Sequence, residues 1–152
     1  MDIKPGSCAD TIEELSRLVN SAAHELDRMV TAHLGGLSVR QWHVLATLEG
    51  GVGRPMTALA EATLLPGPSL TRLVDGMVDD NLVLRKADVI DRRRVLVYQT
   101  RRGGALYRQI RERLNKSEQL TALCASSTLP TDKLTDLLNA LQRPDRPATI
   151  RS

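Results

Sequence analysis

Aromatic residues are scarce in this chain of 152 residues, which has no phenylalanine, two tyrosines and one tryptophan. Proteins that bind single-stranded nucleic acid by base stacking need rows of exposed aromatic side chains. Three scattered aromatic residues cannot supply such a row, which excludes the RNA-recognition and cold-shock folds. The core must instead be built from aliphatic side chains, and the 24 leucines favour packed helices.

Long apolar runs and paired cysteines are also missing. No apolar run exceeds four residues, whereas a membrane-spanning helix needs roughly 20. The first ten residues contain no apolar stretch of the kind found in a secretory signal. Cys8 and Cys124 lie far apart and form no CxxC pair, which is typical of reduced thiols. We therefore expect a cytoplasmic protein with inert thiols, and redox sensing by Cys8 is the minor alternative.

Amphipathic helices are predicted at both ends of the chain. Apolar residues recur at intervals of three and four over residues 10–34, and again in a fifth helix that begins after Thr100 and continues toward Cys124. A last helix is predicted at 131–142, and residues 143–152 are expected to form a flexible tail. From their spacing alone, these leucine stripes could form either a dimer interface or an intramolecular core.

The middle of the chain carries clear signals for short helices. Ser38 and Gln41 form a capping box that starts a helix, and the glycine-rich loop at 49–53 lacks the lysine and hydroxyl of a phosphate-binding loop. Thr57 is predicted to cap a helix over residues 58–63.

After a break at residues 64–68, the next helix is predicted from Pro68, its first residue, to Asp80. It has a buried stripe at i, i+3, i+4, i+7 and i+8 from Leu70, and Asn81 is expected to end it in a left-handed conformation. Gly76 stands inside this helix, where we expect it to allow close approach of another element.

The hydrophobic period then changes to two. Residues 82–87 and 95–99 are predicted strands, and the basic loop at 88–94 between them is only long enough for a hairpin. Two short helices, a tight turn and a β-hairpin make a winged helix-turn-helix at residues 37–100. The predicted fold is therefore mainly α with a small β-hairpin wing.

Positive charge is concentrated on and beside this hairpin. The segment 85–102 has seven basic residues and two acids, whereas the whole chain has a formal net charge of +3. A basic patch on such a frame is the electrostatic signature of a nucleic-acid-binding protein.

The residue types suggest how this surface could read double-stranded DNA. The first turns of a helix in the major groove can reach base edges, and Arg72 could pair with a guanine. An arginine tip can enter a narrow minor groove, and we expect Asp91 to orient the Arg93 side chain by a charge-assisted hydrogen bond. A phosphate is expected at Thr57, at a helix N-terminus. The candidate DNA-binding residues are Pro68, Ser69, Thr71, Arg72, Asp91, Arg92, Arg93 and Arg94.

These segments resemble the MarR family of transcriptional regulators. The resemblance rests on the sequences at 59–61, 69–75, 81–83, 91–97 and 100–103, in that order and spacing. The Asp-x-Arg wing signature of the family maps to Asp91 and Arg93, and its recognition helix maps to residues 68–80. Asn81 departs from the family pattern, which commonly has glycine there.

The resemblance implies a homodimer joined through residues 10–34 and 101–142 and bound to a pseudo-palindromic operator. It further implies a repressor that a small ligand releases, with the ligand in a cleft bordered by the first helix, the helix of Trp42 and His43, and the fifth helix. No ligand residues follow from the sequence.

Other function classes have weaker support. Ser69 has no nearby activating base, and His24 and His33 lie on opposite sides of one helix, so we expect neither an enzyme, nor a metal site, nor a cofactor. The alternative is a winged helix that serves as a protein-interaction or dimerisation module, for which the arginines at 92–94 would have no use.

Overall fold

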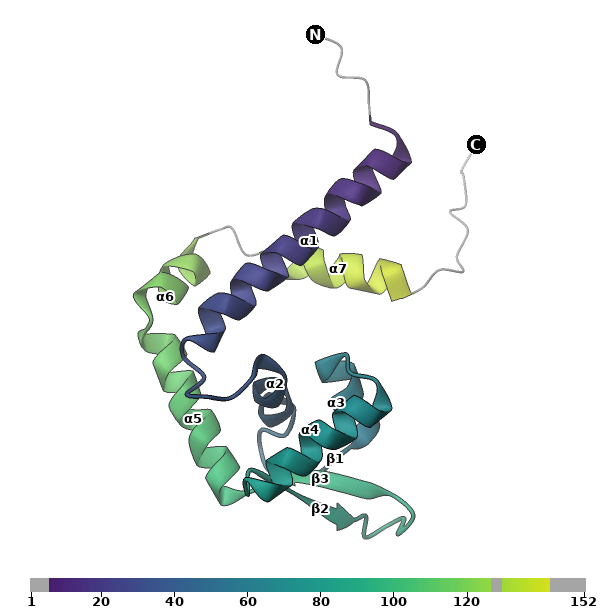
Figure 1. Ribbon diagram of the computed structural model, residues 1–152, viewed down its shortest axis with the longest axis vertical. Helices are drawn as coiled ribbons and strands as arrows, with labels where there is room; N and C mark the ends of the chain where they lie inside the picture. The colour runs from purple at the N-terminus through teal and green to yellow at the C-terminus, as the bar shows by residue number, and fades with distance from the viewer. Residues whose placement is uncertain (1–5, 127–129, 143–152) are drawn as a thin grey trace. The chain divides into compact units, whose positions relative to one another are not determined.

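The computed structural model describes residues 6–126 and 130–142 (Figure 1). The chain divides into two compact units, the first ending at Leu114 and the second beginning at Asn115. The helices are α1 (Cys8–Thr31), α2 (Val39–Thr47), α3 (Met56–Thr63), α4 (Gly67–Asp79), α5 (Arg101–Lys116), α6 (Glu118–Ala125) and α7 (Thr131–Gln142). The strands are β1 (Arg54–Pro55), β2 (Val83–Ala87) and β3 (Val95–Gln99). The predicted mainly α fold with a hairpin wing is confirmed.

Helix α1 begins earlier than predicted because Ser7 and Asp10 form a reciprocal capping box. The Ser7 N–H donates to Asp10 Oδ2 at 2.9 Å, and the Asp10 N–H donates to Ser7 Oγ at 3.2 Å. The helix ends at Thr31, three residues before the predicted end, and Val30 is its one buried residue. Helix α2 has the predicted capping box, in which Ser38 and Gln41 bond each other's backbone N–H.

Helices α3 and α4 form the helix-turn-helix, and both starts differ from the prediction. Thr57 is not an N-cap, because α3 already begins at Met56 after the extended residue Pro55. Helix α4 begins at Gly67 with Pro66 as N-cap, so Pro68 is its second residue, a position where the missing N–H costs no hydrogen bond. Leu64 ends α3 in a left-handed conformation, with φ of 55°.

The end of α4 is fixed by the predicted left-handed residue. Asn81 has φ of 56° and donates its N–H to the Val78 carbonyl at 2.9 Å. The next N–H, from Leu82, donates to the Met77 carbonyl at 2.8 Å. This pair of bonds is a Schellman motif, which turns the chain directly into β2.

The sheet has three antiparallel strands in the order β1-β3-β2. Strands β2 and β3 form the predicted hairpin, from Val83 opposite Gln99 to Ala87 opposite Val95. Strand β1 was not predicted. It is two residues long, includes a proline, and is held at the edge only by pairing with β3.

Helix α5 starts where Thr100 caps it, as predicted. Thr100 Oγ1 accepts from the Gly103 N–H at 2.9 Å, and it lies 2.6 Å from the Asn81 carbonyl, to which it donates. A Cβ atom at Gly103 would overlap the backbone carbonyl of Leu82. The close approach between a glycine and a second element is therefore at Gly103 rather than at Gly76, where a Cβ would meet open space.

The core of the first unit is aliphatic, as the composition indicates. Its main cluster joins α2, α3, α4, β2, β3 and α5, and a second cluster joins α1 to α5 through Val30, Leu34 and Ile110. Leu37, Trp42 and Leu106 pack against both clusters. The helix-turn-helix and the hairpin thus share a continuous core with the C-terminal end of α1 and with α5 as far as Ile110.

The second unit consists of short helices that bury no residue of their own. The fifth helix does not continue to Cys124 as predicted, because Ser117 interrupts it and caps α6 through the Leu120 N–H. The tail predicted at 143–152 lies outside the described residues. None of the described helices is long and apolar enough to cross a membrane.

Candidate nucleic-acid interface

Helix α4 presents a polar face opposite its buried stripe. Leu70, Val74 and Met77 point into the core, which leaves Pro68, Thr71 and Arg72 exposed on the first two turns, with Ser69 half-buried. The Thr71 hydroxyl donates to the Gly67 carbonyl at 3.0 Å, so its oxygen remains available only as an acceptor. Among these four predicted residues, Arg72 is the longest donor on the exposed face.

An ion pair that the sequence did not predict connects α4 to the wing. Arg85 Nη2 on β2 lies 2.6 Å from Asp75 Oδ1 on α4, and the arginine side chain is the more buried of the two. Arg85 is one of the seven basic residues of the segment 85–102, and this carboxylate largely matches its charge. The pair instead helps to set the position of the hairpin relative to α4.

The loop at the wing tip is held by its own backbone and by two aspartates. The Asp88 N–H donates to the Arg94 carbonyl at 2.8 Å, and the Arg94 N–H donates to the Asp91 carbonyl at 2.9 Å. Asp88 Oδ1 accepts from the Ile90 N–H at 3.0 Å, and Asp91 Oδ1 accepts from the Arg93 N–H at 3.1 Å. The loop is therefore a set of turns with defined geometry.

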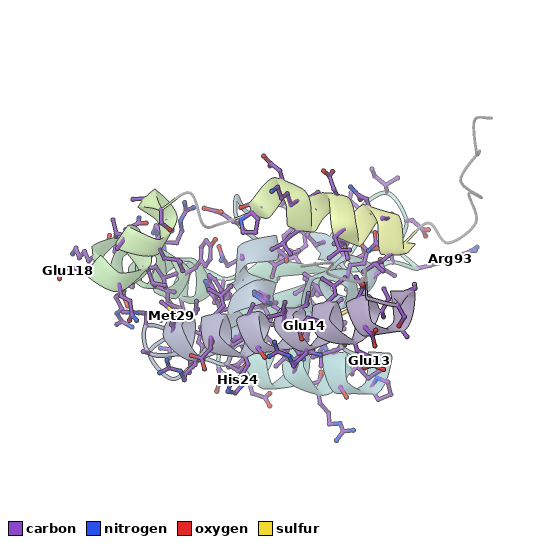
Figure 2. All side chains as sticks on the ribbon, turned by 90° about the horizontal axis from the view of Figure 1, so that it is seen from above. Glu13, Glu14, His24, Met29, Arg93 and Glu118 are labelled. Carbon is purple, nitrogen blue, oxygen red and sulfur yellow. The ribbon has the colours of Figure 1, made fainter. Side chains whose placement is uncertain are left out.

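Asp91 and Arg93 are hydrogen-bonded to each other as predicted, but the predicted bond to the Arg93 side chain is wrong. The aspartate bonds the main-chain N–H of Arg93 instead of its guanidinium group. An aspartate readily bonds the backbone N–H two residues later, in an Asx turn. This bond does not require the long arginine side chain to be held in one conformation. The Arg93 guanidinium is left to extend from the loop, as Figure 2 shows.

The three consecutive arginines of the tip are all exposed. Within residues 6–126 and 130–142, none of Arg92, Arg93 and Arg94 forms an ion pair. Figure 1 shows the loop on the same side of the first unit as the N-terminus of α4. The structure thus brings the predicted residues of the helix and of the wing to one side of the winged helix.

Thr57 lies on the first turn of α3, on the exposed side. The N-cap Pro55 makes no side-chain hydrogen bond, so the first backbone N–H groups of α3 have no side-chain acceptor there. A phosphate at this position remains a prediction.

Further contacts fix the frame, and sequence reasoning missed them because they join distant segments. The Arg40 guanidinium donates to the Thr63 carbonyl at the end of α3, and Lys86 Nζ lies 5.8 Å from the centre of the Tyr98 ring. Arg111 Nη1 on α5 lies 2.6 Å from Glu49 Oε1, two residues after the end of α2. The first and third of these contacts connect α2 and the residues just after it to α3 and α5, and the second joins β2 to β3.

An effector cleft between α1, α2 and α5 remains a prediction. On α2, Trp42 Nε1 is buried and lacks a hydrogen-bond partner among the described residues. The neighbouring His43 ring lies 5.3 Å from the Trp42 ring, and burial lowers the pKa of the imidazole. On α5, burial and the nearby Glu49 carboxylate raise the pKa of the Tyr107 hydroxyl. No three potential metal ligands cluster in the described part of the chain.

A family model identifies the segment that carries this geometry. Residues 35–94, from the turn before α2 to the end of the wing loop, match the model of the MarR family. Over these residues the chain is similar to the MarR family. No curated protein sequence matches the chain.

Solved structures, among them MarR from E. coli, share this fold over nearly the whole chain. BldR, a transcriptional regulator from Sulfolobus solfataricus, is 22% identical with a TM-score of 0.71, covering 91% of this chain and 99% of its own. A MarR variant from E. coli in complex with operator DNA is 22% identical with a TM-score of 0.68, covering 93% and 100%.

BpsR from Bordetella bronchiseptica, whose DNA binding is regulated by 6-hydroxynicotinic acid, is 19% identical with a TM-score of 0.66, covering 95% and 100%. The MarR-like fold therefore extends beyond the matched segment.

Proposed function

We propose that this protein is a transcriptional regulator that binds a specific double-stranded DNA sequence. The observation that carries the proposal is the placement of Arg72 on α4 and Arg92–Arg94 on the wing at one side of a MarR-family frame. The E. coli MarR variant of the same fold is bound to operator DNA. The family is one of transcriptional regulators, and we assign the chain no catalytic role.

In this proposal α4 enters the major groove and the wing tip enters the adjacent minor groove. The exposed turn of Pro68, Ser69, Thr71 and Arg72 faces base edges, where a bidentate arginine contact is worth about 1–3 kcal/mol of discrimination. Arg92, Arg93 and Arg94 lie near the phosphates of the narrow groove, while Asp91 shapes their loop. Thr57 at the start of α3 contacts a phosphate.

The active form is a homodimer on a pseudo-palindromic operator. Helix α1 exposes Ile12, Leu18, Val19 and Leu26, and α7 exposes Leu134, Leu138 and Leu141. Exposed leucine stripes of this extent indicate faces that a partner covers, and a second copy supplies matching stripes under two-fold symmetry. The dimer region is then 10–34 with 101–142, and each protomer reads one half-site.

A small molecule is expected to release the repressor from DNA, by analogy with the regulation of BpsR by 6-hydroxynicotinic acid. The unpartnered Trp42 Nε1 supports a site between α1, α2 and α5, because a buried donor without an acceptor is costly. Because an operator is part of the cell's DNA, we expect the protein to act in the cytoplasm.

A gel-shift titration against DNA from upstream of the protein's own gene tests the proposal. It is run at two salt concentrations with excess nonspecific competitor. Binding that survives the competitor and weakens steeply with salt is expected of a regulator anchored on phosphates. If this upstream DNA does not resist the competitor, the purified protein is used to select bound fragments from genomic DNA. The proposal is wrong if none of the selected fragments resists the competitor either.

A further inference from the structure

Two large apolar side chains stand at the tip of the basic wing. Val89 is 93% exposed and Ile90 is 96% exposed, the two highest values among the exposed large apolar residues of the described chain. Only Asp91 separates them from the three arginines in the same loop. The function proposed above uses the arginines and the aspartates of this loop, but gives these two residues no role.

The hydrogen bonds of the loop make this exposure a fixed feature. The Ile90 N–H is bonded to Asp88 Oδ1, and the turn that follows is closed by the Arg94 N–H on the Asp91 carbonyl. At the base of the loop, the Asp88 N–H bonds the Arg94 carbonyl beyond the last strand pair. Both sides of the Val89–Ile90 pair are therefore anchored, so the pair cannot easily fold back onto the sheet.

Charge complementarity decides which partner covers the pair. Three arginines without ion-pair partners in the described chain follow it in the same loop, so the partner must be strongly anionic and must also accept apolar groups. The minor groove of DNA meets both conditions, because its phosphates line a groove whose floor is made of base edges and sugars. Minor-groove proteins insert Leu, Ile or Phe between base steps in this way.

We infer that Val89 and Ile90 form an apolar wedge that enters the minor groove beside the wing arginines. The wedge contributes affinity by burying its own surface, and it makes binding depend on the base pairs beneath it. This inference rests on the proposed function, since it requires that the wing contacts DNA.

The test compares the double variant Val89→Ser/Ile90→Ser with the matched control Val52→Ser. Val52 is also an exposed apolar loop residue, but it precedes Arg54, which pairs with Val97 in β3, so it lies toward the sheet end away from the wing tip. Serine retains the Ile90 N–H for Asp88, so both variants should fold, as circular dichroism and thermal melting can verify. We expect the double variant to bind the selected DNA about tenfold more weakly and the control to bind like the wild type.

The salt dependence separates an apolar wedge from a phosphate contact. The slope of log K against log salt counts neutralised phosphates. Val89→Ser/Ile90→Ser removes no charge, so its slope should equal that of the wild type while its affinity is lower at every salt concentration. Arg93→Ser should reduce the slope by about one unit.

A second measurement places the wedge in the minor groove. Replacing G·C by I·C pairs where the wing protects the DNA removes only the guanine amino group of the minor groove. We expect the wild type to bind this DNA more tightly than the G·C form, and the double variant to respond less.

If the wild type binds specifically and the double variant binds with the same affinity, the wedge is overturned but the proposed function is not. Val89 and Ile90 would then contact a protein partner instead of DNA. Absence of specific binding by the wild type overturns the proposed function and the wedge with it.

Discussion

Asp91 Oδ1 accepts a hydrogen bond of 3.1 Å from the backbone N–H of Arg93. The carbonyl of the same aspartate accepts from the Arg94 N–H at 2.9 Å, so one acidic residue fixes the turn that carries two basic side chains. An acid beside DNA phosphates is electrostatically unfavourable. Its contribution to the shape of the wing gives a physical reason for its presence.

Substitutions at Asp91 can separate shape from charge. Asp91→Ala removes the negative charge and the acceptor, and we expect binding about threefold to tenfold weaker because one hydrogen bond of the turn is lost. Asp91→Asn removes the charge but keeps Oδ1, so it should bind at least as tightly as the wild type. Fluorescence anisotropy on one operator measures both. Equal tightening by both substitutions would show that only the charge of Asp91 matters.

The wing arginine is expected to anchor the protein on DNA. Arg93→Ala should weaken operator binding tenfold or more and reduce the salt slope by about one unit, because one phosphate neutralisation is lost. The control is Arg108→Ala, which removes an exposed arginine from α5, away from the wing. Titrations at several salt concentrations measure both values. Wild-type affinity in Arg93→Ala would make the wing assignment wrong.

Substituting alanine for either of two helical glycines should change the stability of the protein in opposite directions. Gly76→Ala in α4 places its Cβ in open space and should stabilise the protein by about 1 kcal/mol, the difference in helix propensity. Gly103→Ala in α5 forces a Cβ against the Leu82 carbonyl and should destabilise it by about 3 kcal/mol. Thermal unfolding at one protein concentration compares them, each serving as the other's control. Two shifts of the same sign would contradict this packing.

The apolar face of α1 should be required for the dimer. Leu26→Glu introduces a charge on the exposed leucine stripe and should produce a monomer that binds operator DNA far more weakly. His24→Glu adds the same side chain on the opposite side of the helix and should leave the dimer intact. Light scattering after size exclusion measures the mass. A dimeric Leu26→Glu protein would place the interface elsewhere.

Local signals predicted the parts of this fold that neighbouring residues determine. The capping box of Ser38 and Gln41, the left-handed Asn81 and the Thr100 cap all depend on contacts within a few residues. The hairpin strands were visible because the hydrophobic period changes to two at residue 82.

Long-range contacts account for what the sequence did not reveal. Strand β1 exists through pairing with β3 some forty residues later, and no local pattern marks it. The Asp75–Arg85 pair joins a helix to a strand at no characteristic spacing. Gly76 and Gly103 are both helical glycines, and only the packing of α5 against Leu82 shows which one needs to lack a side chain.

The central claim is that α4 reads the DNA sequence through Arg72. Its most direct test measures the affinities of the wild type and of Arg72→Ala for an operator and for each of its single base-pair variants, with Arg108→Ala as control. We expect Arg72→Ala to lose about tenfold to hundredfold discrimination at one base pair of each half-site and to keep its preferences elsewhere. An unchanged discrimination profile would contradict the claim, because α4 would then not be reading base edges with this residue.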